Sequence, residues 1–291
     1  MDFRSPTDRG NLIAYVQGLE KRARKNPRSI EPPHPPAILQ LPSWGKDVRC
    51  MPNEILRSAL FNARNRNQPR RYFKNEDIAL IDQSTRIRFS GEELRQNDES
   101  VWLQLIHLAK EVPLGNVTEF TAGSMLRALH LKKTRSSIDR LCESLRRMQA
   151  TSLSIHSKRL ASGASFSMIP KFEWQDETTG SQLDKWRVFI APEMAALFGD
   201  VHFTRLLWEQ RLALPSGLAT WLHGYLATHS KPFPIKLATL QRGCGCATDN
   251  SHKFRQLTST ALAELMRVGF LKQGTIRGEL IYTEREKLIN L

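Results

Sequence analysis

The sequence predicts an α+β protein in which one order of elements, three helices followed by a β-hairpin, occurs twice. Apolar residues recur at helical spacing over several stretches, and strand-like runs with turn residues follow each set of helices. Aligning Ile138 with Leu257 gives an offset of 119 residues, and aligning Val101 with Leu218 gives 117. Because the two offsets nearly agree, we interpret the pattern as a repeat of architecture without repeated sequence identity.

The chain is expected to begin with a flexible arm. The stretch KNPRSIEPPHPPAILQLPSW is rich in proline, which disfavours regular packing. A short amphipathic helix around Leu12–Leu19 is the one regular element that the pattern offers there. We therefore assign residues 1–45 to the arm.

The first repeat is expected to follow Met51. The runs Ile78–Ile81 and Thr85–Phe89 around DQST predict a β-hairpin, and ESVWLQLIHLAKEV predicts an amphipathic helix. Thr121 can cap a second helix that ends near His130. The remaining elements are a third helix and four strand-like pieces: Thr134–Gln149, Ser152–Ser157, Ser165–Pro170, Phe172–Trp174 and Trp186–Ile190.

The second repeat has the same order of elements. PSGLATWLHGYLATH predicts a helix, KPFPIKL a break and a short strand, and ATLQRGCG a short helix. NSHKFRQLTSTALAELMRVGF predicts a long helix, and FLKQGTIRGELIYT a hairpin around Arg277–Gly278. This order is that of a winged helix, a helix-turn-helix followed by a strand wing. The sequence thus predicts two tandem winged-helix domains, over residues 46–195 and 196–291.

The charge balance bears on the partner more than on the fold. Lys and Arg number 43 against 29 Asp and Glu, which gives a net charge of +14 and a pI near 10.0. The basic residues are spread through folded segments, which favours nucleic acid over an anionic membrane surface. No apolar run is long enough for a transmembrane helix, and the N-terminus lacks the apolar core of a signal peptide. We expect a cytoplasmic location and no membrane partner.

The exposed face predicted for the first of the two long helices is basic. Projected at 100° per residue, one stripe is apolar from Ile138 to Met148, and the opposite stripe is polar. Arg can pair with guanine edges in the major groove, and other polar residues can hold phosphates. A solvated surface helix, with Glu143 near the same face, is the alternative. The predicted DNA-binding residues are Ser136, Arg140, Ser144 and Arg147, with Lys132, Lys133 and Arg135 at the N-terminal end.

The second long helix gives a similar projection. Its expected core stripe comprises Phe254, Leu257, Ala261, Leu265 and Val268. The opposite stripe carries no acid, and its glutamine can bridge an adenine edge. The predicted DNA-binding residues are His252, Lys253, Gln256, Ser259, Thr260 and Arg267.

A basic run precedes the first predicted hairpin. Like charges repel, so either an acidic partner or a solvated face explains their density. Beside a DNA-binding unit this run can reach a flanking phosphate backbone. The predicted phosphate contacts are Arg64, Arg66, Arg70 and Arg71.

Catalytic and metal-binding motifs are absent from the sequence. It contains no phosphate loop and no H-x-H or H-E-x-x-H pattern, so neither nucleotide hydrolysis nor a metal-dependent nicking site is indicated. Cys244 and Cys246 read C-G-C, one residue short of a zinc knuckle, and no second pair is nearby. We expect no catalytic residue, no metal and no cofactor. Tyr72, Tyr225 and Tyr282 are better interpreted as core or strand residues than as nicking nucleophiles.

Several phrases resemble the TrfA family of plasmid replication initiators. They include WGKDVRCMPNEILRSALFNARN, SGEELRQNDESVWLQLIHLAKEVPLG and KPFPIKLATLQRGCG, with LCESLRRMQATSL and LFGDVHFTRLLWEQRLAL between them. They occur across Trp44–Leu291, so the resemblance covers most of the chain.

The resemblance implies a function without catalysis. Members of the family bind direct repeats (iterons) in a plasmid origin through tandem winged helices and help to open adjacent AT-rich DNA. They recruit the host initiator, the replicative helicase and the sliding clamp, and they are dimers when inactive. The stretch that corresponds to the clamp-binding element begins Gln40-Leu41, although it lacks the family's Leu-Phe pair. The alternatives are a dimeric winged-helix repressor on a palindromic operator and a tyrosine-dependent nickase.

Overall fold

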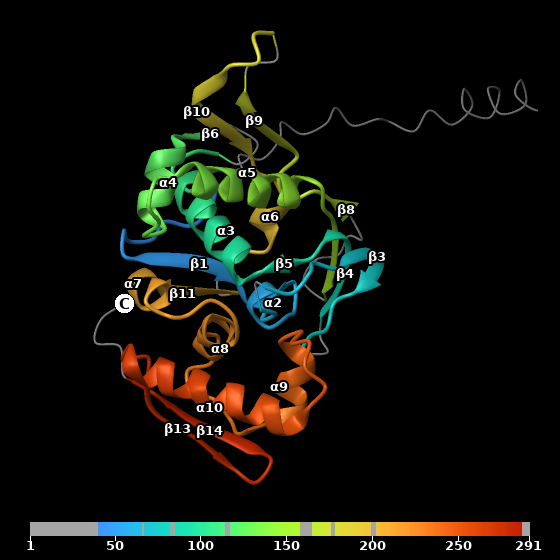
Figure 1. Ribbon diagram of the computed structural model, residues 1–291, viewed down its shortest axis with the longest axis vertical. Helices are drawn as coiled ribbons and strands as arrows, with labels where there is room; N and C mark the ends of the chain where they lie inside the picture. The colour runs from blue at the N-terminus through green and yellow to red at the C-terminus, as the bar shows by residue number, and fades with distance from the viewer. Residues whose placement is uncertain are drawn as a thin grey trace, which may run out of the picture. The chain divides into compact units, whose positions relative to one another are not determined.

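Two helical repeats dominate the computed structural model of the chain, one in the middle of the sequence and one at its C-terminal end (Figure 1). The structure describes residues 40–65, 67–81, 85–113, 117–157, 165–175, 178–198 and 202–286. Most of the expected arm, residues 1–39, lies outside the described residues. Leu39–Leu291 forms one compact unit.

The first repeat combines three helices with a three-stranded antiparallel sheet. Its helices and strands are α3 (Gln96–Ala109), β6 (Val117–Phe120), α4 (Ala122–Ala128), α5 (Arg135–Gln149), β9 (Lys171–Gln175) and β10 (Gln182–Phe189). The sheet order is β6-β10-β9, so the strand between the first two helices pairs with the last strand of the hairpin. The Thr121 hydroxyl caps α4, and this confirms the expected start of the second helix.

The second repeat has the same order and the same sheet topology. It comprises α8 (Leu218–Ala227), β12 (Ile235–Lys236), α9 (Leu237–Gly243), α10 (Ser251–Arg267), β13 (Leu271–Arg277) and β14 (Leu280–Arg285). Its sheet order, β12-β14-β13, matches that of the first repeat strand for strand. The expected hairpin around Arg277–Gly278 is confirmed, and Gly278 supplies the left-handed turn with a φ of 54°.

A four-stranded antiparallel sheet combines two strands that precede α3 with two strands inserted between α5 and β9. Its strands are β3 (Tyr72–Asp77), β4 (Thr85–Glu92), β7 (Ser152–Ser157) and β8 (Ser165–Phe166), in the order β3-β4-β7-β8. The expected hairpin on either side of DQST is present as β3 and β4, but its first strand lies earlier than predicted and ends at Asp77. Of the predicted run Ile78–Ile81, the Ile78 backbone N–H donates to the Ile87 oxygen at 2.8 Å. An edge strand such as β3 tolerates polar side chains on both faces, so the hydrophobic pattern does not reveal it.

The short elements before and after the first repeat complete its core. They are β1 (Val48–Pro52), α2 (Asn53–Leu56), β2 (Phe61–Asn62), β5 (Leu94–Arg95), α6 (Glu193–Ala196), β11 (Phe203–Leu207) and α7 (Trp208–Leu212). β1 pairs antiparallel with β11, from Val48 opposite Leu207 to Pro52 opposite Phe203. The first core therefore extends beyond the domain boundary expected at residue 195.

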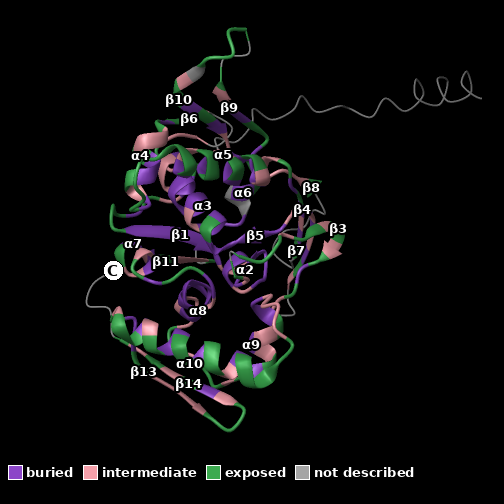
Figure 2. Cartoon of the chain, viewed as in Figure 1, coloured by how far each residue is buried: buried purple, intermediate pink, exposed green. Residues whose placement is uncertain are grey.

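Two hydrophobic clusters lie inside the unit. The larger surrounds α3 and includes Trp102, Leu105 and Phe89, and the smaller includes Phe254 and Leu265 of α10. Figure 2 shows that α3 and α8 are buried on most of their surface, whereas α5 and α10 each keep one exposed face. The third helix of each repeat therefore remains available to a partner.

Candidate nucleic-acid interface

Helix α5 starts with a side-chain cap and a concentration of positive charge. The Thr134 hydroxyl accepts a hydrogen bond from the Ser137 backbone N–H at 3.2 Å. The first turn contains no acidic residue, and Lys132, Lys133 and Arg135 lie exposed around it. Because the helix dipole already makes this end positive, three further cations there are unfavourable unless an anion lies among them. This end of α5 therefore favours binding of a phosphate group.

The exposed surface of α5 continues one turn beyond its start. The Arg140 Nε donates a hydrogen bond to the Ser136 backbone oxygen at 3.0 Å, and both residues are exposed. Within the described part of the chain, no carboxylate is paired with Arg140. The structure thus brings five predicted residues together on one exposed surface: Lys132, Lys133, Arg135, Ser136 and Arg140.

The predicted exposure of Ser144 and Arg147, farther along α5, is wrong. Ser144 is only 4% exposed, and its hydroxyl donates to the Asp98 Oδ1 at 2.7 Å. The Arg147 side chain is 11% exposed and lies 3.4 Å from the same Asp98 oxygen. Asp98 belongs to α3, which packs beneath α5, and a projection of α5 alone cannot include this carboxylate. These two residues anchor the helix and are withdrawn from the predicted DNA-binding surface.

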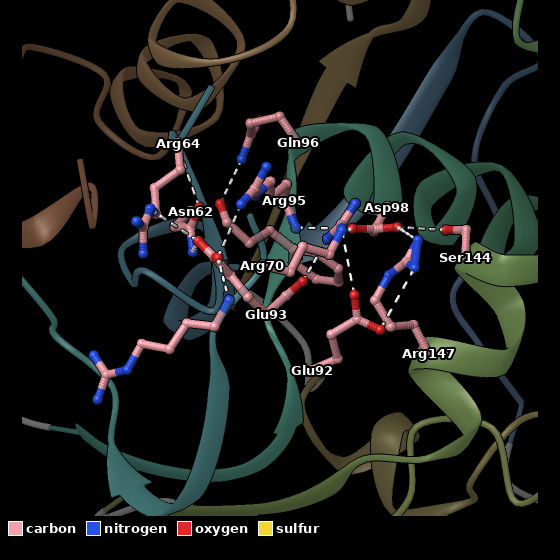
Figure 3. A network of polar contacts seen from close by, with 12 residues as sticks. Asn62, Arg64, Arg70, Glu92, Glu93, Arg95, Gln96, Asp98, Ser144 and Arg147 are labelled. Atoms are coloured by element: carbon pink, nitrogen blue, oxygen red, sulfur yellow. Dashed lines mark hydrogen bonds and ion pairs between the residues drawn. The ribbon is translucent and has the colours of Figure 1, made fainter. Parts of the chain in front are cut away.

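Asp98 is part of a buried polar network that ties α5 to the sheet and loops beside it (Figure 3). The Arg70 Nη1 lies 2.8 Å from the Asp98 Oδ2 and also donates to the Glu93 backbone oxygen. Glu93 is itself fully buried and accepts a hydrogen bond from the Asn62 side-chain amide at 2.7 Å. Its second oxygen lies 3.1 Å from the Arg95 guanidinium.

The pKa of Glu93 reflects this enclosure. Burial by itself raises the pKa, but the Arg71 backbone N–H and the side chains of Arg95 and Asn62 bind the charged form. Together they hold the pKa of Glu93 below its usual range. The carboxylate therefore stays ionised at neutral pH and acts as a fixed negative centre for the surrounding arginines.

The network also corrects the predicted flanking phosphate contacts. The Arg64 Nε lies 3.4 Å from Glu93, and Arg70 pairs with Asp98, so these two guanidinium groups are used inside the protein. Arg71 is exposed and pairs with Glu76 on β3. Arg66 lies outside the described residues. Much of the basic run is thus explained by acids of the same chain.

Helix α10 starts in the same way as α5 but keeps more of its face free. The Asn250 Oδ1 accepts the Lys253 backbone N–H at 2.9 Å, and no acid lies in the first turn. The Thr260 hydroxyl donates to the Gln256 backbone oxygen at 3.1 Å, and both residues are exposed. The predicted residues His252, Lys253, Gln256, Ser259 and Thr260 are all exposed.

Two details of the α10 projection are corrected. Leu257, predicted to be in the core, is 40% exposed, because the buried stripe runs through Thr258 and Leu262. Arg267 is exposed as expected, but it pairs with Glu264 at 2.7 Å and donates to the Ala213 backbone oxygen at 2.7 Å. Arg267 therefore holds the end of α10 against the segment that precedes α8.

A cavity of about 730 Å³ opens beside the start of α10. Lys253 and Leu257 line it from α10, and Asn65 and Gln68 line it from the loop that follows β2. Sequence reasoning did not bring these segments together, since no pattern connects a loop of the first repeat with a helix of the second. Asn65 and Gln68 are therefore polar neighbours of the α10 surface that a projection of α10 alone could not include.

The stretch predicted as a clamp contact packs against the first core. Gln40 is exposed, but Leu41 is 4% exposed and belongs to the larger hydrophobic cluster. Trp44 is also buried, and its Nε1 donates to the His107 Nδ1 at 2.9 Å. Leu41 is therefore not available as an exposed anchor, which corrects that prediction.

The described residues contain no group of three or more His, Cys, Asp or Glu side chains that could hold a metal ion. Cys244 is buried and Cys246 is half-buried, and both are free thiols. None of the helices among these residues is long and apolar enough to cross a membrane.

Comparison with solved structures finds a similar fold. A crystal structure of domains 2 and 3 of RctB aligns with a TM-score of 0.52 at 12% sequence identity, covering 80% of this chain and 97% of the other. A crystal structure of Pi initiator protein in complex with iteron DNA aligns with a TM-score of 0.49 at 15% identity, covering 67% and 93%. The TM-score of the second alignment is too low to support a shared fold. The first supports a shared mixed helix-and-strand fold.

Comparison with protein sequences identifies a family. The plasmid replication initiator protein TrfA of Escherichia coli is 30% identical over 250 residues, which cover 86% of this chain and 65% of the relative. The chain thus corresponds to about two thirds of the length of that relative. The family model described as TrfA protein matches residues 35–285. The chain therefore belongs to the TrfA protein family.

Proposed function

We propose that both repeats are winged helices and that α5 and α10 are their recognition helices. The order of helices and strands, the sheet orders β6-β10-β9 and β12-β14-β13, and the exposed third helices support this assignment. In such domains the third helix enters the major groove while the rest of the domain contacts the backbone.

One observation carries the proposal that the partner is duplex DNA. At equivalent places in the two repeats, α5 and α10 each begin with a side-chain cap, an acid-free first turn and exposed cations. A single such helix is common on protein surfaces, but the same arrangement on both third helices is explained by one polyanion that contacts both. The net charge of +14 supports the same partner.

The proposed biological role is initiation of plasmid replication. The protein binds direct repeats (iterons) in a plasmid origin, helps to open the adjacent AT-rich DNA and recruits the host initiator and replicative helicase. Membership of the TrfA family supports this role. A dimer in the inactive state, a contact with the sliding clamp and a bacterial cytoplasmic location belong to the same proposal. The role requires no catalytic turnover, no metal and no cofactor.

A winged-helix repressor that binds a palindromic operator as a dimer is the competing function. The two differ in the symmetry of the bound site, because a monomer with two different recognition helices reads an asymmetric sequence. The different residues on α5 and α10, with Arg140 on one and Gln256 on the other, support an asymmetric site.

Selection from random duplexes tests the proposal. The enriched duplexes are sequenced and bound again at two salt concentrations, and the mass of the complex is measured by light scattering. We expect one asymmetric motif, bound by a monomer with an affinity that falls steeply with salt. A palindrome bound by a dimer would support the repressor. Salt-sensitive binding without enrichment would mean that neither helix reads bases.

A further inference from the structure

An arginine that the DNA-binding surface does not use is buried between the two repeats. Arg211 lies on α7, in the segment that joins them, and its side chain is 0% exposed. Its Nη2 lies 3.5 Å from the Oε2 of Glu99 on α3, and Glu99 is buried as well. Burial lowers the pKa of Arg211 and raises that of Glu99, as expected for charges removed from water.

The Arg211 guanidinium contacts both repeats. Its Nη2 donates to the Gln96 Oε1 at 3.1 Å and its Nε to the Ser100 hydroxyl at 3.3 Å, both on α3 of the first repeat. Its Nη1 donates to the backbone oxygen of Thr220, on α8 of the second repeat, at 3.4 Å. The planar guanidinium group thus links the first turns of the two helices in a fixed geometry.

Each of these helices holds a proposed recognition helix. Asp98, adjacent to Glu99 on the first turn of α3, binds Ser144 and Arg147 of α5. On the other side, α8 shares the second hydrophobic core with α10. A continuous series of buried contacts therefore runs from α5 through α3, Arg211 and α8 to α10, and Figure 1 shows α3 and α8 between the two outer helices.

Further bonds join the second repeat to the segment that precedes the first repeat, and they are compatible with a rigid junction. The Trp221 Nε1 on α8 donates to the Ser58 backbone oxygen at 3.0 Å. The Ala63 backbone N–H donates to the Cys244 backbone oxygen at 2.9 Å. These bonds hold the junction together, but Arg211 is the residue here that joins the two helices supporting α5 and α10.

We infer that Arg211 is a positioning residue that fixes the separation and rotation of α5 relative to α10, and thereby the base-pair spacing of the DNA site. The inference rests on the proposed function, since it assumes that both helices read one duplex. A buried ion pair is a costly way to stabilise a fold, and apolar residues of similar volume often serve as well. Its directional bonds instead select one arrangement of the two repeats.

The spacing of the bound sequence is the property to measure. The probe is the duplex enriched by random selection, together with versions that carry one, two or three extra base pairs at its centre. Each insertion moves the two half-sites apart by about 3.4 Å and rotates them by about 35°. A rigid protein cannot follow this change, so we expect the native chain to lose at least tenfold in affinity with two inserted base pairs.

The test variant removes both charges together. A single Arg211→Ala change leaves Glu99 buried without its partner and can unfold the chain, so we choose the pair Glu99→Gln with Arg211→Met. The matched control is Glu93→Gln with Arg95→Met, which removes a buried ion pair whose two members both lie on the segment that leads into α3. Circular dichroism and urea unfolding verify that both double variants are folded.

The expected result is a change in spacing preference rather than in affinity alone. The Glu99→Gln/Arg211→Met variant should bind the native spacing within a few fold of the native chain and lose less than threefold with two inserted base pairs. The Glu93→Gln/Arg95→Met control should lose affinity with two inserted base pairs to the same extent as the native chain.

Three results would overturn the inference. In the first, the Glu99→Gln/Arg211→Met variant loses as much affinity with two inserted base pairs as the native chain does. In the second, the control variant tolerates the insertions as well as the Glu99→Gln/Arg211→Met variant does. In the third, the native chain binds the duplexes with inserted base pairs as tightly as the selected duplex. That result would contradict the role of Arg211 but not the proposed DNA binding. Failure of the proposed function gives a different result, because no duplex is then enriched from the random pool.

Discussion

Helices α5 and α10 occupy equivalent places in the two repeats but are anchored by different chemistry. Helix α5 is held by buried charge, since Ser144 and Arg147 bind Asp98 beneath it. Helix α10 is held by apolar packing, and its buried Thr258 hydroxyl is satisfied within the helix by the Phe254 backbone oxygen. The anchoring of α5 uses the second half of its polar face. The comparison teaches that equivalent helices in one chain can offer unequal surfaces to the same partner.

Removing the charged anchor of α5 should have the largest effect. Asp98→Ala leaves Arg70 and Arg147 without their buried carboxylate, and breaking such a pair typically costs about 3–5 kcal/mol of stability. Urea unfolding monitored by tryptophan fluorescence measures this loss. The matched control is Asp77→Ala on exposed strand β3, which should leave the midpoint nearly unchanged. Equal midpoints for the two variants would show that the network does not anchor α5.

Acid should destabilise the chain through its buried histidines before it reaches the buried carboxylates. His223 is buried on α8 within the second repeat, and burial, with Arg211 and Arg285 nearby, lowers its pKa to about 3. The unfolded chain takes up a proton near pH 6.5 while the folded chain does not, so stability is lost as pH falls below that value. His223 should thereby remove about 2 kcal/mol between pH 7 and pH 5. Glu93, whose pKa is lowered, contributes its loss only at more acidic pH.

Urea unfolding of His223→Leu at pH 7 and pH 5 tests this assignment. Burial also lowers the pKa of His107 in the first repeat, to about 4, and that of His229 in the second, so the variant should remove only part of the pH dependence. His252→Gln on the exposed face of α10 is the control and should leave the dependence unchanged. A native slope in His223→Leu would contradict the prediction.

The contrast between the two faces should also appear in base recognition. Gln256→Ala on α10 and Arg140→Ala on α5 should each lower the discrimination between the selected duplex and a scrambled one by about 1–3 kcal/mol, if each side chain contacts a base edge. Competition binding measures both. If Arg140→Ala leaves discrimination intact, α5 contacts only phosphates, and the difference between the two helices is greater than their exposed residues indicate.

The smallest expected effect concerns phosphate contact at the start of α5. Lys133→Ala should weaken binding to all duplexes alike and reduce the slope of log affinity against log salt by about one unit. Fluorescence anisotropy over a salt series measures the slope. Lys272→Ala is the control, because Lys272 on β13 already pairs with Glu284. An unchanged slope in Lys133→Ala would remove this residue from the interface.

The sequence alone predicts those elements whose signal comes from residues close together in the chain. The long amphipathic stripes located the two third helices and Thr121 located the start of α4, because helical periodicity and caps depend on neighbours in the chain. The sequence does not predict whether a side chain is buried when that depends on a residue far away in the chain. Ser144 is buried because Asp98 lies beneath it, and Leu41 is buried because the first core extends to it. The link from α3 through Arg211 to α8 has no sequence pattern at all.

The pairing of β1 with β11 has a consequence for how the chain is made. More than half of the chain separates these two strands, so β1 leaves the ribosome long before its partner exists. Until β11 is synthesised, the edge of β1 is unpaired and open to other chains. The first repeat can therefore complete its fold only after the segment leading into the second has emerged. A fragment that ends at residue 195 should aggregate, whereas one that ends after α7 retains the partner strand.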